Sequence, residues 1–326
     1  MKNNLQKNFT EELIINKYLK KLNFNKRGTY NFENDASYIN LKKNKKLIIT
    51  TDSISEDLDF FKNDNPKSIA TKIITINLSD LSAMGAKPYA YSLSLFLPNY
   101  IDKKWIKFFT NELFKIQKKH NFFLLGGDLS KSNKLSITST FFGTSNTNIL
   151  ASQNSINLYD DIWITGNLGD SYVGLQILNN KIKIKNDIIR KFFLKKYYYP
   201  NPCLLGPKLT KYINAIKDNS DGFIGDLNKM LNNKYGAKLN LSNLPFSSFL
   251  NNLLNKKKIK KKYIINSGDN YQLIIISNKK FRNKIIHIAK KNYVKITRVG
   301  KVTENNKIVD DSNNLLNIPK KYDHFC

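Results

Sequence analysis

The sequence predicts an α/β fold of the layered α+β kind, divided into two domains. Strand-like and helix-like segments alternate along the chain, as they do in domains whose helices cover a sheet. With 326 residues and 41% hydrophobic content, the chain can fill two ordinary cores. The pattern gives way to Ser, Asn and Gln between residues 144 and 159, and the domain boundary is placed there. The expected domains are residues 1–150 and residues 151–326.

Hydrophobic spacing predicts the elements of the first domain. Apolar residues recur at helical spacing after Glu11, and a long helix that begins at Pro66 is ended by Gly85 and Pro88. A buried strand leads into Gly126. In order, the expected elements are a helix at residues 11–22, a strand at 46–51, helices at 66–85 and 101–119, and strands at 122–125 and 135–143.

The second domain begins with a strand that leads into Gly166 and Gly169. Neither domain contains a detectable internal repeat. The elements expected after that boundary are a strand at 161–165, helices at 171–178, 202–214 and 222–235, a strand at 271–277, a helix at 280–291 and a strand at 294–302.

The composition predicts an unexported, cytoplasmic protein. No window offers eighteen or more uncharged apolar residues, and residues 1–20 carry Asn, Gln, Glu and Lys where a signal peptide has its apolar core. The two cysteines, Cys203 and Cys326, are far apart, which indicates neither a disulfide framework nor a CxxC metal site. We therefore expect no membrane partner and a reducing compartment.

The formal charge of +29 raises nucleic-acid binding as a hypothesis. The lysines are spread along the whole chain together with Asn and Ile, so a solvated basic surface explains the charge better than one binding face. The one dense run, Lys256–Lys262, contains Ile259 and no aromatic residue before Tyr263, which favours a solvated loop over an RNA-stacking site. No specific nucleic-acid partner is expected.

The aspartates of this acid-poor chain fall at strand ends, in a glycine turn and near an apolar helix face. Such positions do little for surface solubility, but they suit a cleft in which hard oxygen ligands converge on Mg²⁺. Thr50 and Thr51 can add hydroxyl or carbonyl oxygens beside the first of them. The aspartates are Asp52, Asp80, Asp128, Asp218 and Asp221.

Structural explanations compete with the metal hypothesis at these positions. Asp221 can cap the helix expected after it, and taken alone the cap is the better explanation. Asp128 follows two glycines, and Gly-Gly-Asp is a common turn sequence. Asp80 is harder to explain in this way, because it lies near Ile76 and Met84, where an unpaired carboxylate is costly.

Missing motifs exclude several catalytic classes. There is no GxxxxGK[ST] loop, no GxGxxG opens a helix after a strand, and the HRD and DFG motifs of protein kinases are missing too. The three histidines, His120, His287 and His324, form neither HExxH nor the context of a hydrolytic triad. His120 is expected to act as a cap at the C-terminal end of a helix.

The segment from Ile76 to Pro88, Ile-Asn-Leu-Ser-Asp-Leu-Ser-Ala-Met-Gly-Ala-Lys-Pro, resembles thiamine-monophosphate kinases. Further motifs of that family follow in its order and span nearly the whole chain, which chance does not readily produce. These motifs are Asn34-Asp35-Ala36, Thr50-Thr51-Asp52, Gly126-Gly127-Asp128, Thr165-Gly166 with Leu168-Gly169-Asp170, Asp218 to Gly222, Ser267 to Leu273 and Tyr322 to Phe325.

The resemblance implies a two-domain fold of the aminoimidazole-ribonucleotide-synthetase-like superfamily. Its members bind ATP between two α/β domains, and they usually pair their N-terminal sheets into a dimer barrel. It follows that the first domain would bind metal and ATP and dimerise, and that the second would complete the ATP and substrate site. The implied partners are ATP, thiamine monophosphate and a second copy of the chain in a homodimer, and the implied product is thiamine diphosphate.

The family's functional positions carry over residue by residue. Several Mg²⁺ ions would be held by Asp35, Thr50, Thr51, Asp52, Asp80, Asp128, Asp218 and Asp221. ATP would contact Gly127, Asp128, Gln153 and Ser220. The acceptor, thiamine monophosphate, would contact Asp59, Asp269 and Tyr322.

The chemistry of this reaction agrees with a site made of carboxylates. Two polyphosphates of like charge must meet in line, so catalysis rests on positioning and on neutralisation by Mg²⁺. The acceptor is already a phosphate oxygen anion, and no catalytic general base is therefore expected. Direct transfer without a phosphoenzyme follows.

The departures from the family concern the organic substrates more than the metals. Asp59 stands where the family has a histidine, and Gln153 stands where it has an arginine that meets ATP. The Gly-Glu-Asp-Tyr-Glu motif becomes Gly-Asp-Asn-Tyr-Gln at residues 268–272. After Asp128, Leu-Ser-Lys replaces the usual Thr-Thr-Arg. The loss of the arginine that meets ATP removes a bidentate phosphate donor, which Lys131 or a neighbouring lysine can replace as a point charge.

Other functions remain open as alternatives. A selenophosphate synthetase needs a reactive Cys or selenocysteine before Asp35, and none is there. Hydrogenase maturation proteins of this fold carry a C-terminal cysteine, as Cys326 allows, although Tyr322 to Phe325 match the kinase ending. The remaining alternatives are a related ATP-dependent enzyme with another acceptor and a basic nucleic-acid-binding protein on a decayed kinase scaffold.

Overall fold

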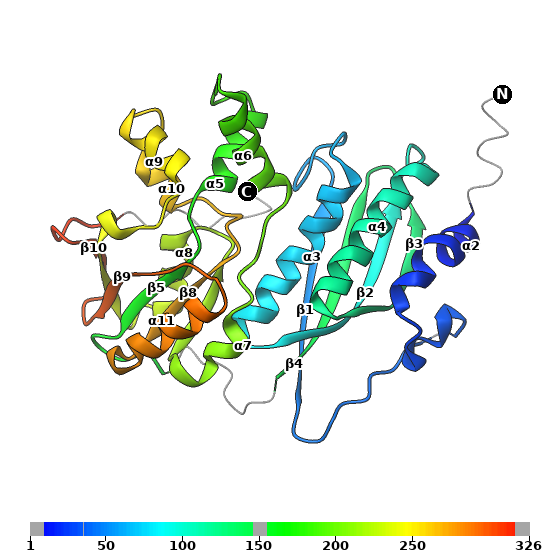
Figure 1. The fold of residues 1–326 in the computed structure, drawn as a ribbon, viewed down its shortest axis with the longest axis horizontal. Helices are drawn as coiled ribbons and strands as arrows, with labels where there is room; N and C mark the ends of the chain where they lie inside the picture. The colour runs from blue at the N-terminus through cyan, green and yellow to red at the C-terminus, as the bar shows by residue number, and fades with distance from the viewer. Residues whose placement is uncertain (1–9, 35, 146–154, 317–326) are drawn as a thin grey trace. The chain divides into compact units, whose positions relative to one another are not determined.

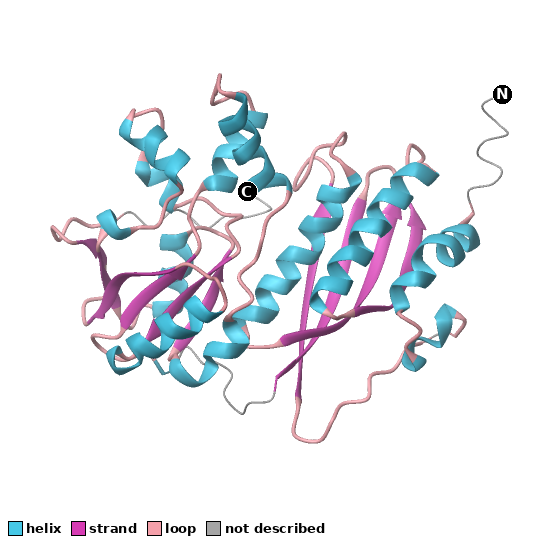
Figure 2. Ribbon diagram, in the orientation of Figure 1, coloured by secondary structure: helices cyan, strands magenta, loops and turns pink. Residues whose placement is uncertain are grey.

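The computed structural model describes residues 10–34, 36–145 and 155–316, and the chain divides into two compact units (Figure 1). The first unit comprises Met1–Leu81 and Ala86–Thr147, and the second comprises Ser82–Gly85 and Asn148–Cys326. Each unit has its own sheet with helices packed against it (Figure 2). The α/β fold expected from the sequence is confirmed.

The first unit contains a four-stranded sheet with the strand order β1-β4-β2-β3. Strand β4 runs antiparallel to both of its neighbours, whereas β2 and β3 are parallel. A parallel pair needs a crossover connection, and a helix between β2 and β3 supplies it. The strands are β1 (Lys46–Ser55), β2 (Lys87–Leu97), β3 (Phe123–Lys131) and β4 (Ser136–Ser145).

Helices α3 (Pro66–Ala83) and α4 (Lys103–His120) cover one face of this sheet (Figure 1). Asp102 begins α4, because its side chain accepts a hydrogen bond from the N–H of Trp105 at 2.7 Å. Asn121 ends the helix with a φ of 57°, in the left-handed region that Asn tolerates. The fully buried apolar side chains of α4 are Ile106, Phe109 and Leu113.

The helix expected over residues 11–22 is present as one helical stretch whose hydrogen-bond pattern changes along its length. Thr10 caps it, with its hydroxyl accepting a hydrogen bond from the N–H of Leu13 at 3.2 Å. The stretch comprises α2 (Glu11–Ile14), the π-helical turn η1 (Ile15–Leu19) and the 3₁₀ turn η2 (Lys20–Asn23), and a second 3₁₀ segment, η3 (Arg27–Phe32), follows it.

The face of the first sheet opposite α3 and α4 carries a ladder of hydroxyl groups. Thr51 and Thr140 are joined at 2.9 Å, and Ser53 and Thr138 are joined at 2.7 Å. These residues alternate along β1 and β4 with side chains that are buried against the helices. Ile49 lies on the same open face and is 58% exposed. In this unit the face is therefore only partly covered.

The second unit contains a six-stranded sheet with the order β10-β7-β9-β5-β8-β6. The outer pair β10 and β7 is parallel, and the remaining neighbours are antiparallel. The strands are β5 (Asp161–Thr165), β6 (Ala215–Asn219), β7 (Gly236–Leu239), β8 (Gln272–Ser277), β9 (Ile296–Thr303) and β10 (Ile308–Asp310).

Two hydrophobic cores lie on the two faces of this second sheet. One core packs helices α5, α6, α8, α9 and α10 against the sheet, with Val173, Phe193 and Leu227 fully buried. The other packs α7 and α11 against it through Leu209 and Ile285. The helices are α5 (Asp170–Leu178), α6 (Asp187–Tyr198), α7 (Gly206–Leu209), α8 (Phe223–Leu231), α9 (Ser248–Asn255), α10 (Lys261–Ile265) and α11 (Arg282–Lys291).

Three expectations about the elements are wrong. The helix expected over residues 202–214 is reduced to α7 and a 3₁₀ turn, Thr210–Tyr212, before the chain enters β6. The prolines at 202 and 207 explain the loss, since each removes a backbone donor and neither fits a helix interior. The expected elements omit the central strand β2, the strands β6, β7 and β10, and the helices α6, α9 and α10. Strand β3 is longer than expected and includes Gly127 and Asp128, which were placed in a turn after it.

Within the described ranges, no helix is both long enough and apolar enough to cross a membrane.

Candidate functional site

Thr50 and Asp80 link strand β1 to helix α3. The hydroxyl of Thr50 donates a hydrogen bond to Oδ2 of Asp80 at 2.6 Å. Asp52 lies two residues further along β1, and it therefore faces the helices as Thr50 does. Thr51 points to the opposite face, where its hydroxyl pairs with that of Thr140. This corner groups two carboxylates with one hydroxyl, and Thr51 can add only its backbone carbonyl.

Gly127 and Asp128 lie on the edge strand β3. A Cβ at Gly127 would lie 1.8 Å from the carbonyl oxygen of Leu93, so the pairing with β2 requires glycine here. Asp128 is opposite Ser94 in the register, on the face directed away from the helices. Its Oδ2 accepts a hydrogen bond from the hydroxyl of Ser130 at 2.8 Å. The carboxylate of Asp128 is exposed at the edge of the sheet.

Asp52 and Asp128 lie at opposite edges of the first sheet. The row that starts at Asp52 crosses Ser139 and Leu93 before it reaches Gly127. Three interstrand steps of about 4.8 Å place the two edges about 14 Å apart. Asp52 also faces the helices, whereas Asp128 faces away from them. The sheet of one chain therefore keeps these two carboxylates apart.

Asp59 lies in the turn that follows β1. Its Oδ2 accepts a hydrogen bond from the N–H of Ser55 at 2.8 Å. Lys72 reaches the same residue from α3 and donates to its backbone carbonyl at 2.7 Å. One carboxylate oxygen of Asp59 thus stabilises its own turn.

A cavity of about 360 Å³ opens beside Gly127 and Asp128 in the first unit. Its walls come from the N-terminal helical stretch and from strands β2 and β3. A cavity with a largely apolar wall and a few polar side chains at its strand edge suits a flat ring that carries polar groups at one end. The apolar lining residues are Ile15, Leu19, Phe32, Ala36, Leu93, Leu124, Leu125, Leu129 and Phe142.

In the second unit, Asp218, Ser220 and Asp221 lead from the end of β6 to the start of α8. Asp218 is only 4% exposed, whereas the side chain of Asp221 is 49% exposed. Gly222 has a φ of 114°, and a Cβ there would lie 2.6 Å from the carbonyl oxygen of Asn266. Both facts require glycine at this position. The loop that carries the two aspartates is thereby held closely against residues 266–269.

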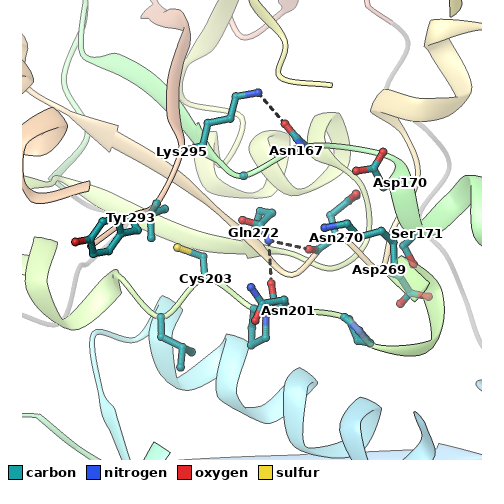
Figure 3. Close-up of a pocket in the computed structure, with 16 residues that line it drawn as sticks. Asn167, Asp170, Ser171, Asn201, Cys203, Asp269, Asn270, Gln272, Tyr293 and Lys295 are labelled. Carbon is teal, nitrogen blue, oxygen red and sulfur yellow. Dashed lines mark hydrogen bonds between the residues drawn. The ribbon is translucent and has the colours of Figure 1, made fainter. Parts of the chain in front are cut away.

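Asp269 belongs to this facing segment and is hydrogen-bonded through its backbone to Ser220. Asp269 also lines a cavity of about 240 Å³ within the second unit (Figure 3). The start of α5, the loop before α7 and the turn before β9 supply the other walls. Across the cavity, Lys295 donates a hydrogen bond to the side chain of Asn167 at 2.8 Å. Gln272 donates to the backbone carbonyl of Asn201 at 3.1 Å.

Asp170 is the buried acid of this cavity. It is 5% exposed, and its Oδ1 accepts a hydrogen bond from the hydroxyl of Ser247 at 2.6 Å. Burial raises the pKa of Asp170, while that hydroxyl and the charges of Lys196 and Lys295 act against the rise. Asp170 is not among the site residues expected from the sequence. Its position one residue after Gly169, at the start of a helix, was the available signal.

The oxygen donors of Thr50, Asp52 and Asp80 fit Mg²⁺ that arrives with a polyphosphate. In the parts of the chain that the structure describes, no three side chains of His, Cys, Asp or Glu gather closely enough to hold a metal ion alone. Mg²⁺ does not need such a cage. It usually takes one or two carboxylates and fills its remaining positions with waters and substrate phosphates.

Residues 33–145 match the family model of AIR synthase related protein, N-terminal domain. Over 97% of its length the chain is 35% identical to the thiamine-monophosphate kinase of Buchnera aphidicola subsp. Acyrthosiphon pisum (strain APS), and the match covers 99% of that protein. The chain belongs to the thiamine-monophosphate kinase family. The resemblance drawn from the motifs is thereby confirmed.

Solved structures of thiamine-monophosphate kinases share the fold. The structure from Stenotrophomonas maltophilia K279a aligns with a TM-score of 0.78 at 26% identity, covering 86% of this chain and 89% of that one. AaThiL complexed with AMPPCP and TMP aligns with a TM-score of 0.77 at 25% identity, covering 87% of this chain and 89% of that one.

The structure places most of the positions expected from thiamine-monophosphate kinases. In the first unit it groups Thr50, Asp52 and Asp80, and it sets Asp59, Gly127 and Asp128 apart from them. In the second unit it brings together Asp218, Ser220, Asp221 and Asp269. The residues Asp35, Gln153 and Tyr322 lie outside the described residues.

Proposed function

We propose that this chain transfers the γ-phosphoryl group of ATP to the phosphate of thiamine monophosphate and so forms thiamine diphosphate. The observation that carries the proposal is the 35% identity to a thiamine-monophosphate kinase over 97% of the chain. The likeness to AaThiL complexed with AMPPCP and TMP supports it, since AMPPCP is an analogue of ATP.

The metal positions are assigned to carboxylates and threonines of the chain. Bound Mg²⁺ ions would neutralise the charge of the phosphates and hold them in line. The hydrogen bond between Thr50 and Asp80 supports a shared role for these two residues, because it fixes both side chains before any ion binds. The assigned residues are Asp35, Thr50, Thr51, Asp52, Asp80, Asp128, Asp218 and Asp221.

The ATP contacts are assigned to Gly127, Asp128, Gln153 and Ser220. The cavity beside Gly127 supports the assignment in the first unit, since its apolar walls suit an adenine ring. The acceptor contacts are assigned to Asp59, Asp269 and Tyr322. The second-unit cavity lined by Asp269 has a size and mixed polarity that suit a small heteroaromatic cation such as thiamine.

Transfer is direct in this proposal. A phosphate oxygen of thiamine monophosphate attacks the γ-phosphorus while the bond to the ADP oxygen breaks. The attacking oxygen is an anion at neutral pH, so no residue has to remove a proton from it. The chain's residues orient the two substrates and exclude competing water. A cytoplasmic location remains a prediction from the sequence.

A homodimer fits the edges of the first sheet. Strands β1 and β3 are the outer strands of that sheet, so β3 of one protomer can pair with β1 of its partner and close eight strands into a barrel. Such a barrel would cover the hydroxyl ladder and the exposed Ile49. It would also bring the strand edge that carries Asp128 of one protomer next to the partner's β1, with Asp128 directed into the barrel and the partner's Asp52 directed toward the helices outside it.

Mixed dimers test this arrangement. Asp52→Asn and Asp128→Asn should each abolish thiamine diphosphate formation. Random exchange of protomers between the two inactive proteins should restore about a quarter of wild-type activity, because half of the dimers then carry one intact site. Two variants that stay inactive after proven exchange would show that both residues act within one protomer.

The first test of the function is thiamine diphosphate formation by the purified protein with ATP, Mg²⁺ and thiamine monophosphate. Free thiamine serves as the control acceptor. Product from the monophosphate alone is expected. If ATP binds and no product forms, the acceptor is a different molecule or the enzyme has lost activity.

A further inference from the structure

We propose that Asp226 is a positioning residue for Asp218 and Asp221, and that it accepts their lysine partners when a divalent ion binds. The inference rests on the proposed function, because it takes these two aspartates as metal positions. Asp226 lies in the first turn of α8 and is fully buried. Neither the motifs nor the family resemblance assigned it a role.

Asp226 first holds the backbone of the loop. Its Oδ2 accepts a hydrogen bond from the N–H of Asp221 at 2.9 Å. The bond fixes the direction in which the chain leaves β6 and enters the helix. An amide oxygen could make the same bond, so this contact alone does not require a charge.

The other oxygen of Asp226 lies between two lysines. Its Oδ1 is 3.5 Å from Nζ of Lys229 and 3.7 Å from Nζ of Lys217. Lys229 also binds the carboxylate of Asp221, and Lys217 lies 3.5 Å from that of Asp218. The five side chains therefore form a chain of alternating charge with Asp226 at its centre.

Because the charges alternate, each lysine has Asp226 as a second carboxylate with which it can pair. A divalent ion at Asp218 or Asp221 repels the ammonium group that shares the carboxylate. Each lysine already lies within 4 Å of Asp226, so a small side-chain rotation keeps it paired. Burial raises the pKa of Asp226, and Lys217 is the strongest influence against that rise. Closer pairing with the two lysines would offset the free-energy cost of burying the charged carboxylate of Asp226.

A double-mutant cycle on the full chain tests the exchange. The variants are Asp226→Asn, Lys229→Met and the double variant, and the asparagine keeps an acceptor for the N–H of Asp221. The probe is Mn²⁺ in the presence of AMPPCP, with free Mn²⁺ counted by electron paramagnetic resonance. Circular dichroism and the thermal midpoint establish that each variant is folded.

Asp226→Asn is expected to weaken Mn²⁺ binding about tenfold, because Lys229 then has only Asp221 as a partner. Lys229→Met should change Mn²⁺ affinity by less than about twofold in the wild type and restore most of the loss in the Asp226→Asn background. Additive effects of the two substitutions would overturn the proposal, since they would show independent charges.

The single variant Lys229→Met keeps the proposal testable if Asp226→Asn does not fold. A lysine that must give up its only partner would tighten Mn²⁺ binding tenfold or more when it is removed, and that result would refute the exchange. Failure of the proposed function gives a different result: a wild-type protein that binds no Mn²⁺ with AMPPCP refutes the metal assignment itself. Binding with additive variants refutes only the role of Asp226.

Discussion

The backbone N–H of Asp269 donates a hydrogen bond to the carbonyl oxygen of Ser220 at 2.9 Å. Ser220 is a proposed ATP contact and Asp269 a proposed acceptor contact, so this bond fixes the two positions against each other within the second unit. Gly268 permits the approach, because a Cβ there would lie 2.3 Å from the same carbonyl oxygen. Alignment of two substrates is the main burden of phosphoryl transfer, and a rigid link between their contacts serves it.

The charge of Asp269 should matter for the acceptor and not for ATP. Asp269→Asn keeps an oxygen that can accept the hydrogen bond from the hydroxyl of Tyr271, which is 2.7 Å long. The loop should therefore stay in place while the cavity loses a negative charge. Steady-state kinetics should show KM for thiamine monophosphate raised about tenfold and KM for ATP within about twofold.

Asp187→Asn is the matched control for this prediction, since Asp187 is an exposed carboxylate on α6 whose partners are the surface cations Arg190 and Lys191. It should leave both KM values unchanged. An equal rise in the two KM values of Asp269→Asn would contradict a specific role in acceptor binding.

Two adjacent glycines should respond differently to a methyl group. A Cβ at Gly127 would lie 1.8 Å from the carbonyl oxygen of Leu93, whereas the nearest atom to one at Gly126 is the hydroxyl of Ser37 at 3.6 Å. Gly127→Ala should lower stability by about 2 kcal/mol and weaken ATP binding, because β3 must move away from β2. Gly126→Ala should stay within about 0.5 kcal/mol of the wild type.

Urea unfolding and nucleotide titration measure both effects. Equal stability of the two variants would mean that β3 yields without cost, and the requirement for glycine at position 127 would then be functional only.

The local hydrophobic pattern of the sequence predicted the long helices. It failed for segments whose secondary structure depends on pairing with residues far away in the sequence. Helix α4 has caps and an apolar face of its own, and α3 is a long run that begins at Pro66 and stops before Gly85, so their sequences alone predict them. The 202–214 segment is apolar at helical spacing, but prolines and the pairing of β6 with β8 prevail there. Pairing partners far away in the sequence cannot be inferred from one chain.

The candidate site likewise has features that a local motif predicts and features that depend on distant residues. The order Asp218, Ser220, Asp221 is a local motif, and the sequence predicted it as a unit. The contact of Ser220 with Asp269 depends on a loop almost fifty residues later in the sequence, and the sequence gives no distance for it. Gly127 looked like a turn glycine, while its real constraint is the neighbouring strand at Leu93.

Substitutions at the neighbouring residues Thr50 and Thr51 of β1 should affect metal binding differently. Thr50 donates its hydroxyl to Asp80, whereas the hydroxyl of Thr51 pairs with Thr140 on the opposite face. Thr50→Val removes an oxygen beside Asp80 with little change of shape. The Mg²⁺ concentration for half-maximal activity should rise about tenfold, which corresponds to the loss of about 1.5 kcal/mol for one hydrogen bond to a charged group.

Thr51→Val is the control and retains the backbone carbonyl that is assigned to the metal. Its Mg²⁺ requirement should stay within about twofold of the wild type. A larger effect at Thr51 than at Thr50 would reverse the assignment of the two faces.

His120 should make the protein less stable in mild acid. Burial, aided by the charge of Lys119, lowers the pKa of His120 from 6.5 to about 4. This outweighs the preference of a helix C-terminus for a charged histidine. Between pH 6.5 and 4 the unfolded chain binds the proton more readily, so the contribution of His120 is present above pH 6.5 and is lost as the pH falls.

The variant His120→Gln should flatten this part of the pH dependence. Because the ring is only partly buried, we expect a difference of about 1 kcal/mol between pH 7.5 and pH 5. Urea midpoints of wild type and variant at the two pH values measure it. Identical slopes would show that other groups cause the acid sensitivity.

A buried amide at the end of β6 should cost stability without serving the reaction. The side chain of Asn219 is fully buried, and within the described residues neither its oxygen nor its nitrogen has a hydrogen-bond partner. Leaving such groups unsatisfied costs about 1–3 kcal/mol. Asn219→Val should therefore raise the urea midpoint by an amount equivalent to about 1 kcal/mol, since valine also suits a strand.

Asn214→Val provides the opposite case on the same segment. The amide of Asn214 donates a hydrogen bond to Oδ2 of Asp160 at 2.7 Å, so its removal should destabilise the protein by about 1–2 kcal/mol. If Asn219→Val destabilised the protein as much as Asn214→Val does, the amide of Asn219 must be satisfied by a bound water. In that case the loop that follows β6 would be built around that water, and Asn219 would help to position Ser220.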